Sequence, residues 1–185
     1  LIREETSRLS RIVDNVLAFA RIERGRESQP CSPGDAGLVV GELQETFAPL
    51  FERKSIVCTY DGSPVEGLWV DRDAFSQILS NLLSNVEKYA GEGARARVTL
   101  SMQGNSVVTE VEDDGPGIPV DARQRVFLPF ERACSHVNEG ASGTGLGLAI
   151  SRELAGRAGG TLDLVPTLGG AKFRLVLPSV ERRQG

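Results

Sequence analysis

Three short segments of the sequence carry polar residues in arrangements that could bind a ligand. In the first, VEDDGPGIP, Asp113 follows Val107 and Val111 on the apolar side of a predicted strand. A carboxylate that faces an apolar layer needs a hydrogen-bond donor to offset its desolvation. The donor is either the backbone of the next turn, which Asp113 would cap, or the exocyclic amino group of a bound base. In the second case Gly115 and Gly117 would let the backbone approach the base closely.

A helix predicted to begin at Asp71 or Asp73 carries the second arrangement. Four polar side chains share a stripe beside its apolar one, and they are Gln77, Asn81, Asn85 and Lys88. Such a stripe is either a solvated helix face or a ligand site, and asparagine is a poor helix former that a solvated face does not need. An amide oxygen suits Mg²⁺, a lysine neutralises phosphate charge, and the next residue, Tyr89, could stack on a base.

The stretch SGTGLGLAIS, residues 142–151, is the third arrangement, with glycines at every second position directly before a predicted helix. Helix N-termini with small residues present free N–H groups to anions, so the segment is either a phosphate site or a flexible hinge. It is not a Walker loop, since no Lys-Ser/Thr pair follows, and not a dinucleotide-binding turn, since no strand precedes it. Thr144 stands where a serine-hydrolase elbow requires glycine. The three segments together could form one ATP site.

The composition excludes several other classes of protein. With 185 residues, 40% of them hydrophobic, and a net charge of −4, the chain is expected to be soluble and globular. No apolar run approaches the ~20 residues that cross a bilayer. The three cysteines are far apart and the basic residues are scattered, so no zinc site, disulfide framework or nucleic-acid surface is predicted. The cytoplasm is the expected compartment.

Four helices are predicted. Residues 1–25 place apolar side chains seven apart, as in a helical seam that packs on another helix. A second helix begins at Asp35, and Pro49 should kink or shorten it. The fourth runs from Thr144 to Ala158. The predicted apolar stripe of the second helix is Val40, Leu43, Phe47, Leu50 and Phe51, and that of the third is Phe75, Ile78, Leu79, Leu82 and Val86.

Strands are predicted between the helices. SIVCTY and GLWVD are short strand candidates, and alternating residues on either side of QGN and of TLGG predict two hairpins. The expected fold is an α/β (α+β) two-layer sandwich, in which a mixed sheet has helices on one face and one N-terminal helix precedes it.

The segments NLLSNVEKYA, DDGPGIP, FLPFERA and GTGLGLAI, in this order, resemble the sequence boxes of the sensor histidine kinases, whose catalytic domain has the Bergerat ATPase fold. The resemblance covers residues 30–178. It implies that residues 1–27 are the second helix of a dimerisation and phosphoacceptor hairpin, and that residues 28–181 are the catalytic ATP-binding domain.

The resemblance also implies roles for single residues. Asn85 would coordinate Mg²⁺, with Asn81 close by, and Lys88 would meet the phosphates. Tyr89 would contact the adenine ring, and Asp113 would accept a hydrogen bond from the adenine amino group. The other residues implied to contact ATP are Gly115, Gly117, Ile118, Phe130, Ser142, Gly143, Thr144, Gly145, Leu146, Gly147 and Leu148.

A lid over the nucleotide is implied as well. Phe127 and Phe130 would anchor its base, and Gly143, Gly145 and Gly147 would shape it. Arg132 could approach the terminal phosphate, which adds it to the implied catalytic group of Asn81, Asn85 and Lys88.

The implied function is transfer of the ATP γ-phosphate to a histidine on the hairpin, for relay to the receiver domain of a response regulator. In the family that histidine lies on the first hairpin helix, whereas this chain begins on the second. His136, in the predicted lid, is expected to be a solvated residue and not the acceptor. The fragment should therefore bind ATP without phosphorylating itself, while its full-length parent forms a homodimer. It is expected to contact neither nucleic acid nor membrane.

The ATP-hydrolysing members of the same superfamily differ from this chain at one important position. Type II topoisomerases and the large heat-shock chaperones hydrolyse ATP with a Glu four residues before the magnesium-binding Asn, where this chain has Asn81. An amide cannot act as general base for water, whereas an imidazole nitrogen already carries its lone pair. A kinase is therefore favoured over a hydrolase. A non-catalytic nucleotide-binding module and an anti-sigma-type serine kinase stay open.

Overall fold

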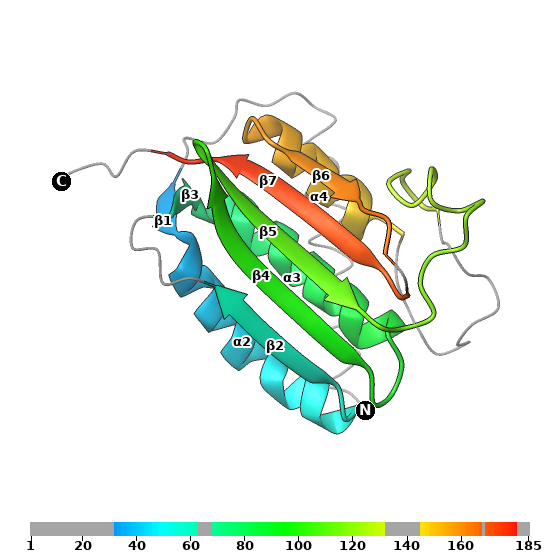
Figure 1. The fold of residues 1–185 in the computed structure, drawn as a ribbon. Helices are drawn as coiled ribbons and strands as arrows, with labels where there is room; N and C mark the ends of the chain where they lie inside the picture. Colours follow the sequence, from blue (N-terminus) through cyan, green and yellow to red (C-terminus); the bar gives the residue numbers. More distant parts are fainter. Residues whose placement is uncertain (1–31, 63–67, 132–144, 168, 181–185) are drawn as a thin grey trace, which may run out of the picture.

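The computed structural model describes residues 32–62, 68–131, 145–167 and 169–180. In this part of the chain a five-stranded sheet carries three helices on one face, as predicted (Figure 1). The predicted N-terminal helix, Arg132, His136 and residues 142–144 lie outside the described residues.

The sheet has the strand order β2-β4-β5-β7-β6. β2 and β4 pair in parallel, and the other neighbours are antiparallel, so the predicted mixed sheet and both hairpins, β4–β5 and β6–β7, are confirmed. Two short strands, β1 and β3, form a separate antiparallel pair. β3 lies within the predicted strand GLWVD, whereas its pairing with β1 was not predicted. The strands are β1 (Pro33–Asp35), β2 (Val57–Gly62), β3 (Trp69–Asp71), β4 (Arg95–Gln103), β5 (Ser106–Asp113), β6 (Thr161–Leu164) and β7 (Lys172–Pro178).

The helices are α2 (Ala36–Arg53), α3 (Arg72–Tyr89) and α4 (Gly147–Arg157), and α3 packs between the other two. Aspartates cap two of them, as predicted: the Asp35 carboxylate accepts from the first N–H groups of α2, and the Asp71 carboxylate accepts from Ala74 N in α3. Gly159, with φ of +77°, follows the end of α4 in the left-handed conformation typical of a helix stop.

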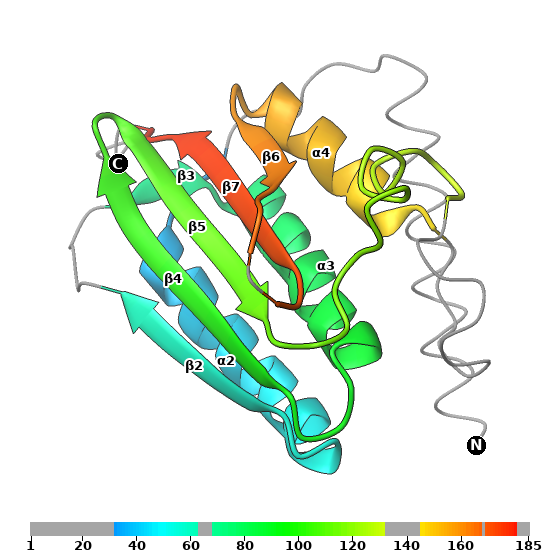
Figure 2. The ribbon, with the colours of Figure 1, turned by 45° about the vertical axis from the view of Figure 1, so that its right-hand side comes forward.

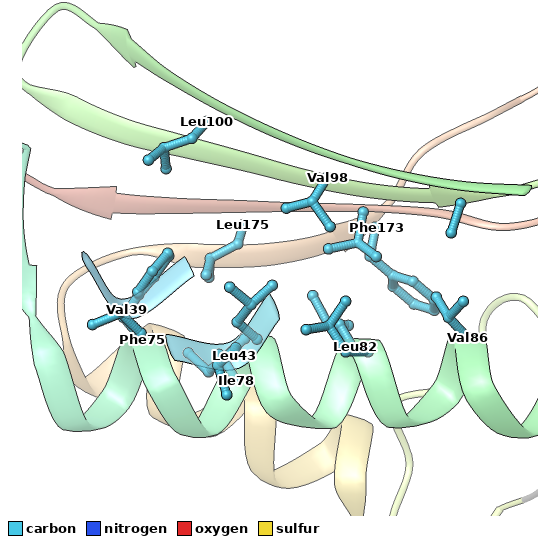
Figure 3. Close-up of a cluster of buried hydrophobic side chains, with 14 of the residues drawn as sticks. Val39, Leu43, Phe75, Ile78, Leu82, Val86, Val98, Leu100, Phe173 and Leu175 are labelled. Atoms are coloured by element: carbon cyan, nitrogen blue, oxygen red, sulfur yellow. The ribbon is translucent and has the colours of Figure 1, made fainter. Parts of the chain in front are cut away.

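The core lies between the helices and the sheet (Figure 3). All five residues of the predicted α3 stripe are buried, and Leu83 is buried too, because a helix with neighbours on both sides hides more than one stripe. The sheet contributes alternate residues of β4 and β7, such as Val98, Leu100, Phe173 and Leu175. α3 is thus fixed on three sides.

Two predicted helix boundaries need correction. α2 is not shortened at Pro49 but continues to Arg53, because Pro49 is solvent-exposed and the buried rings of Phe47 and Phe51, 5.8 Å apart, hold the last turn in the core. α4 begins at Gly147, since the left-handed φ of +70° at Gly145 cannot belong to a helix. In α2, Val39 is the fully buried valine, whereas Val40 is only partly buried.

Candidate functional site

Asp113, the last residue of β5, points toward the helix layer and caps the turn that follows it. Its Oδ1 accepts from Gly115 N at 2.9 Å and from Ala171 N at 3.4 Å. The capping alternative is therefore correct for this oxygen. Within the described residues nothing donates to Oδ2. One carboxylate oxygen thus builds the turn, and the other can accept a hydrogen bond from a further donor.

Burial changes the acidity of this carboxyl group. Desolvation raises the pKa of Asp113 above its usual range, and the backbone donors Gly115 N and Ala171 N oppose that rise only in part. The nearby carboxylates of Asp114 and Glu112 raise the pKa further. A hydrogen-bond donor at Oδ2 would stabilise the ionised form of Asp113, because it would offset part of the desolvation cost of the carboxylate.

The glycines around Asp113 allow protein segments to meet. A Cβ on Gly115 would lie 2.6 Å from Ala90 Cα, just past the end of α3, and a Cβ on Gly117 would lie 2.5 Å from the Gly170 carbonyl oxygen in the β6–β7 turn. The turn after β5 is therefore wedged between the C-terminal end of α3 and the β6–β7 turn. This close packing is a second reason for glycine at both positions, and the predicted approach to a base stays untested.

The polar stripe of α3 is only partly exposed to solvent, since Gln77, Asn81, Asn85 and Lys88 are all half-buried. The Asn85 amide makes no hydrogen bond within the described residues. Asn81 differs, because its Nδ2 donates to Ser151 Oγ at 3.1 Å and to Gly147 O at 3.4 Å, both on α4. Two asparagines one helical turn apart are thus in different situations: one is engaged and the other is open.

The start of α4 joins the segment that carries the phenylalanines. Phe130 N donates to Gly145 O at 3.0 Å, and a Cβ on Gly145 would lie 2.8 Å from the Phe130 carbonyl carbon. Phe130 itself has a left-handed φ of 66° and a side chain that is 68% exposed, so it holds the segment through its backbone. Phe127 anchors by its ring, which meets Phe173 edge-on at 6.2 Å and lies under the Arg152 guanidinium.

The predicted site residues within the described chain therefore come from segments that touch one another. The turn after β5 meets the end of α3, Asn81 joins α3 to α4, and Phe130 joins the intervening segment to Gly145. Figure 2 shows that segment running from the end of β5 past α3 to the start of α4. Ile118 and Leu148 are partly buried against the core, Leu146 is fully buried, and Tyr89 is 41% exposed.

A pocket of about 370 Å³ borders this cluster on the side of Phe127, Gly170 and Ala171. It is lined by Arg123, Phe127, Arg152 and the β6–β7 connection, and from the predicted ATP contacts it includes only Ile118. Sequence reasoning also did not find Ser151, Arg152 and Ala171. The available signal for Ser151 was a serine that follows an apolar run, LGLAI, in the first turns of a predicted helix. The contacts of Ala171 are made by its backbone, so its residue type gives no signal.

The described residues could hold Mg²⁺ only together with nucleotide phosphates and water, and not by protein side chains alone. The described ranges contain no group of three His, Cys, Asp or Glu side chains that could hold a metal by themselves. Mg²⁺ needs few protein ligands, because it keeps several waters and shares phosphate oxygens with a nucleotide. The open amide of Asn85 can provide one such ligand.

Comparison with known proteins identifies the domain. Residues 70–181 match the family described as histidine kinase-, DNA gyrase B- and HSP90-like ATPase. The chain belongs to this family. Within it, the chain is a Bergerat-fold ATPase domain that is similar to the catalytic domains of sensor histidine kinases. The predicted family and fold are thereby confirmed.

Similar proteins include the alginate biosynthesis sensor protein KinB of Pseudomonas aeruginosa, 30% identical over 96% of this chain and 29% of KinB. The crystal structure of full-length ShkA in complex with AMPPNP has a TM-score of 0.82 and 30% identity over 97% of this chain and 38% of ShkA. The histidine kinase ThkA, in complex with the response regulator protein TrrA, shares the fold with a TM-score of 0.74, 24% identity and coverage of 97% and 49%. The chain thus spans less than a third of KinB.

Among the described helices none combines the length and the apolar character that a bilayer crossing requires.

Proposed function

We propose that the chain is the catalytic domain of a protein-histidine kinase that binds ATP and transfers its γ-phosphate to a histidine on a hairpin. The observation that carries the proposal is the partly buried Asp113 carboxylate, whose Oδ1 is engaged by backbone N–H groups while Oδ2 accepts from no described residue. Such an oxygen accepts from an amino group and rejects a carbonyl, which distinguishes adenine from guanine. The AMPPNP complex of ShkA supports the same ligand class.

The residues divide the work as follows. Asp113 binds the adenine amino group, and Tyr89, 41% exposed at the end of α3, covers the base. Lys88, in the last turn of α3, contacts the phosphates, and the N–H groups of Gly145 and Gly147 provide further donors. Asn85 holds Mg²⁺, which when bound neutralises charge on the phosphate oxygens. Arg132 and residues 142–144 complete the site.

The transfer needs little chemistry from the protein. One imidazole nitrogen of the acceptor histidine attacks the γ-phosphorus with its lone pair as the bond from phosphorus to the β,γ-bridging oxygen breaks. The products are phosphohistidine and ADP. No base has to remove a proton before the attack, so an amide at Asn81 does not impair this reaction, whereas it would impair hydrolysis by water.

The remaining assignments concern the whole protein. Residues 1–27 form the second helix of the dimerisation hairpin, the parent is a homodimer in the cytoplasm, and its phosphoryl group passes to a response regulator. The complex of ThkA with the response regulator protein TrrA supports the last assignment.

Mixing experiments test the transfer. The chain and radiolabelled ATP are incubated with a separately made hairpin that carries the first helix and its histidine. An acid-labile label on the hairpin supports the proposal. Nucleotide binding without transfer would instead support the non-catalytic module, and an acid-stable label on serine the serine kinase.

A further inference from the structure

The hydrogen bonds of Asn81 define a contact between α3 and α4. Its amide reaches Ser151 Oγ at 3.1 Å and Gly147 O at 3.4 Å, which are one turn apart on the inner face of α4. A carbonyl oxygen can only accept, so the end of the Asn81 amide that faces α4 is its NH₂ group. Ser151 is fully buried, and it is one of two polar residues in the core of the described chain.

The start of α4 needs such a contact. Its N-cap residue, Leu146, makes no side-chain capping bond, and the first turn has no acidic residue. Gly145, just before it, has a left-handed φ of +70°. The first turn of α4 is therefore held by the burial of Leu146 and Ile150 without a side-chain cap, and Asn81 adds a polar contact to that turn from the neighbouring helix.

We infer that Ser151 is a positioning residue, which acts by holding the Asn81 amide. The Asn81–Ser151 pair holds the first turn of α4 against α3, together with the glycine segment, which is defined as residues 145–147. Asn85 lies one turn beyond Asn81 on the same face of α3, so the pair sets the position of the glycine segment relative to the Asn85 amide. Asn81 then acts through α4 and not on the nucleotide. The inference rests on the proposed function, since it assumes that both segments contact phosphates.

Comparing the affinities of Ser151 variants for ATP and for adenosine tests the inference. Adenosine reaches only the base-binding part of the site, whereas ATP also needs the positioned glycine segment. Ser151→Ala should weaken ATP binding by about three- to tenfold, the size expected from one lost hydrogen bond, and leave adenosine binding within about twofold. Ser151→Cys restores the volume without a strong acceptor and should behave like Ser151→Ala. Ser76→Ala, a partly buried serine at the start of α3, is the matched control and should change neither affinity.

A double-mutant cycle and hydrogen exchange complete the test. Asn81→Ala combined with Ser151→Ala should weaken ATP binding no more than Asn81→Ala alone, because the contact that Ser151→Ala removes is already lost in Asn81→Ala. In the ligand-free protein, Ser151→Ala should speed amide exchange in residues 147–150. Equal loss of ATP and adenosine affinity, full rescue by Ser151→Cys, or additive effects would overturn the inference. An unchanged chain that binds neither ligand would instead contradict the proposed function itself.

Discussion

Asp113 and Ala171 are joined twice at the end of the β5–β7 ladder: Asp113 N donates to Ala171 O at 2.9 Å, and Ala171 N donates to Asp113 Oδ1 at 3.4 Å. The two residues are 58 positions apart in the sequence. Because the backbones of Ala171, just before β7, and of Gly115 fix one carboxylate oxygen, the direction of the other is fixed as well. The sheet itself therefore orients the group that would read the base.

The raised pKa of Asp113 predicts a pH dependence of adenosine binding. The adenine amino group needs an ionised acceptor, so affinity is retained above the pKa and falls as the pH drops through it. Because burial raises the pKa of Asp113, the loss should set in above the ordinary carboxyl value of about 4. Titration calorimetry with adenosine, which carries no phosphate to titrate, measures the profile. A flat profile, or the same profile in Asp113→Asn, would remove the carboxylate from this role.

The β6–β7 turn offers a matched pair of glycines for stability. Gly170 has φ of +70°, and a Cβ there would run into the Asp113 carbonyl oxygen, whereas a Cβ on Gly169 would meet nothing within 4 Å. Gly170→Ala should lower the free energy of unfolding by at least about 2 kcal/mol, while Gly169→Ala should change it by less than about 0.5 kcal/mol. Urea denaturation compares the two variants. Equal midpoints would show that the turn does not pack on Asp113 as described.

The buried hydroxyl of Thr109 is a site where a substitution should stabilise the fold. Its hydroxyl is fully buried on β5, between Leu100 and Leu175 of the adjacent strands, and no partner for it lies among the described residues. Thr109→Val keeps the shape and removes the unpaired group, so the free energy of unfolding should rise by about 1 kcal/mol. Thr99→Val, on the face of the sheet without helices, should have little effect. Destabilisation of Thr109→Val by more than about 1 kcal/mol would indicate that the hydroxyl has a partner after all.

The proposed role of Asn85 as a Mg²⁺ ligand predicts how its removal changes the magnesium dependence of ATP binding. Asn85→Ala should remove most of the gain in ATP affinity that Mg²⁺ gives to the unchanged chain, about tenfold or more, while adenosine binding persists. Gln77→Ala changes the same stripe two turns earlier and is the control. If Asn85→Ala kept the full magnesium-dependent gain, another group would have to be the ligand.

How far the sequence predicts this site depends on the range of the contacts. Strand parity places Asp113 toward the helix layer, and helical spacing places Asn85 beside a buried stripe, because both properties are local. The partners of these residues are not local. Ala171 meets Asp113 and Ser151 meets Asn81 only once the sheet and the helix layer have formed. For the same reason the sequence left open whether Asp113 caps the turn or binds a ligand, whereas the structure shows that Oδ1 caps the turn and that Oδ2 accepts no hydrogen bond from the described residues.

The glycines show a similar limit. Gly115 and Gly117 are recognisable in the sequence as positions of close approach, but the segments that approach them, Ala90 and Gly170, come from a helix end and a distant turn. Pro49 shows the opposite case, in which a local signal predicted a shortened helix and the packing of Phe51 prevailed.

The most direct test is a crystal structure of the chain with Mg²⁺ and a non-hydrolysable ATP analogue. We predict the adenine amino group within hydrogen-bonding distance of Asp113 Oδ2, the metal at Asn85 and the phosphates at the start of α4. A nucleotide bound instead in the pocket between Arg123, Arg152 and β6, with Asp113 Oδ2 still open, would contradict the account.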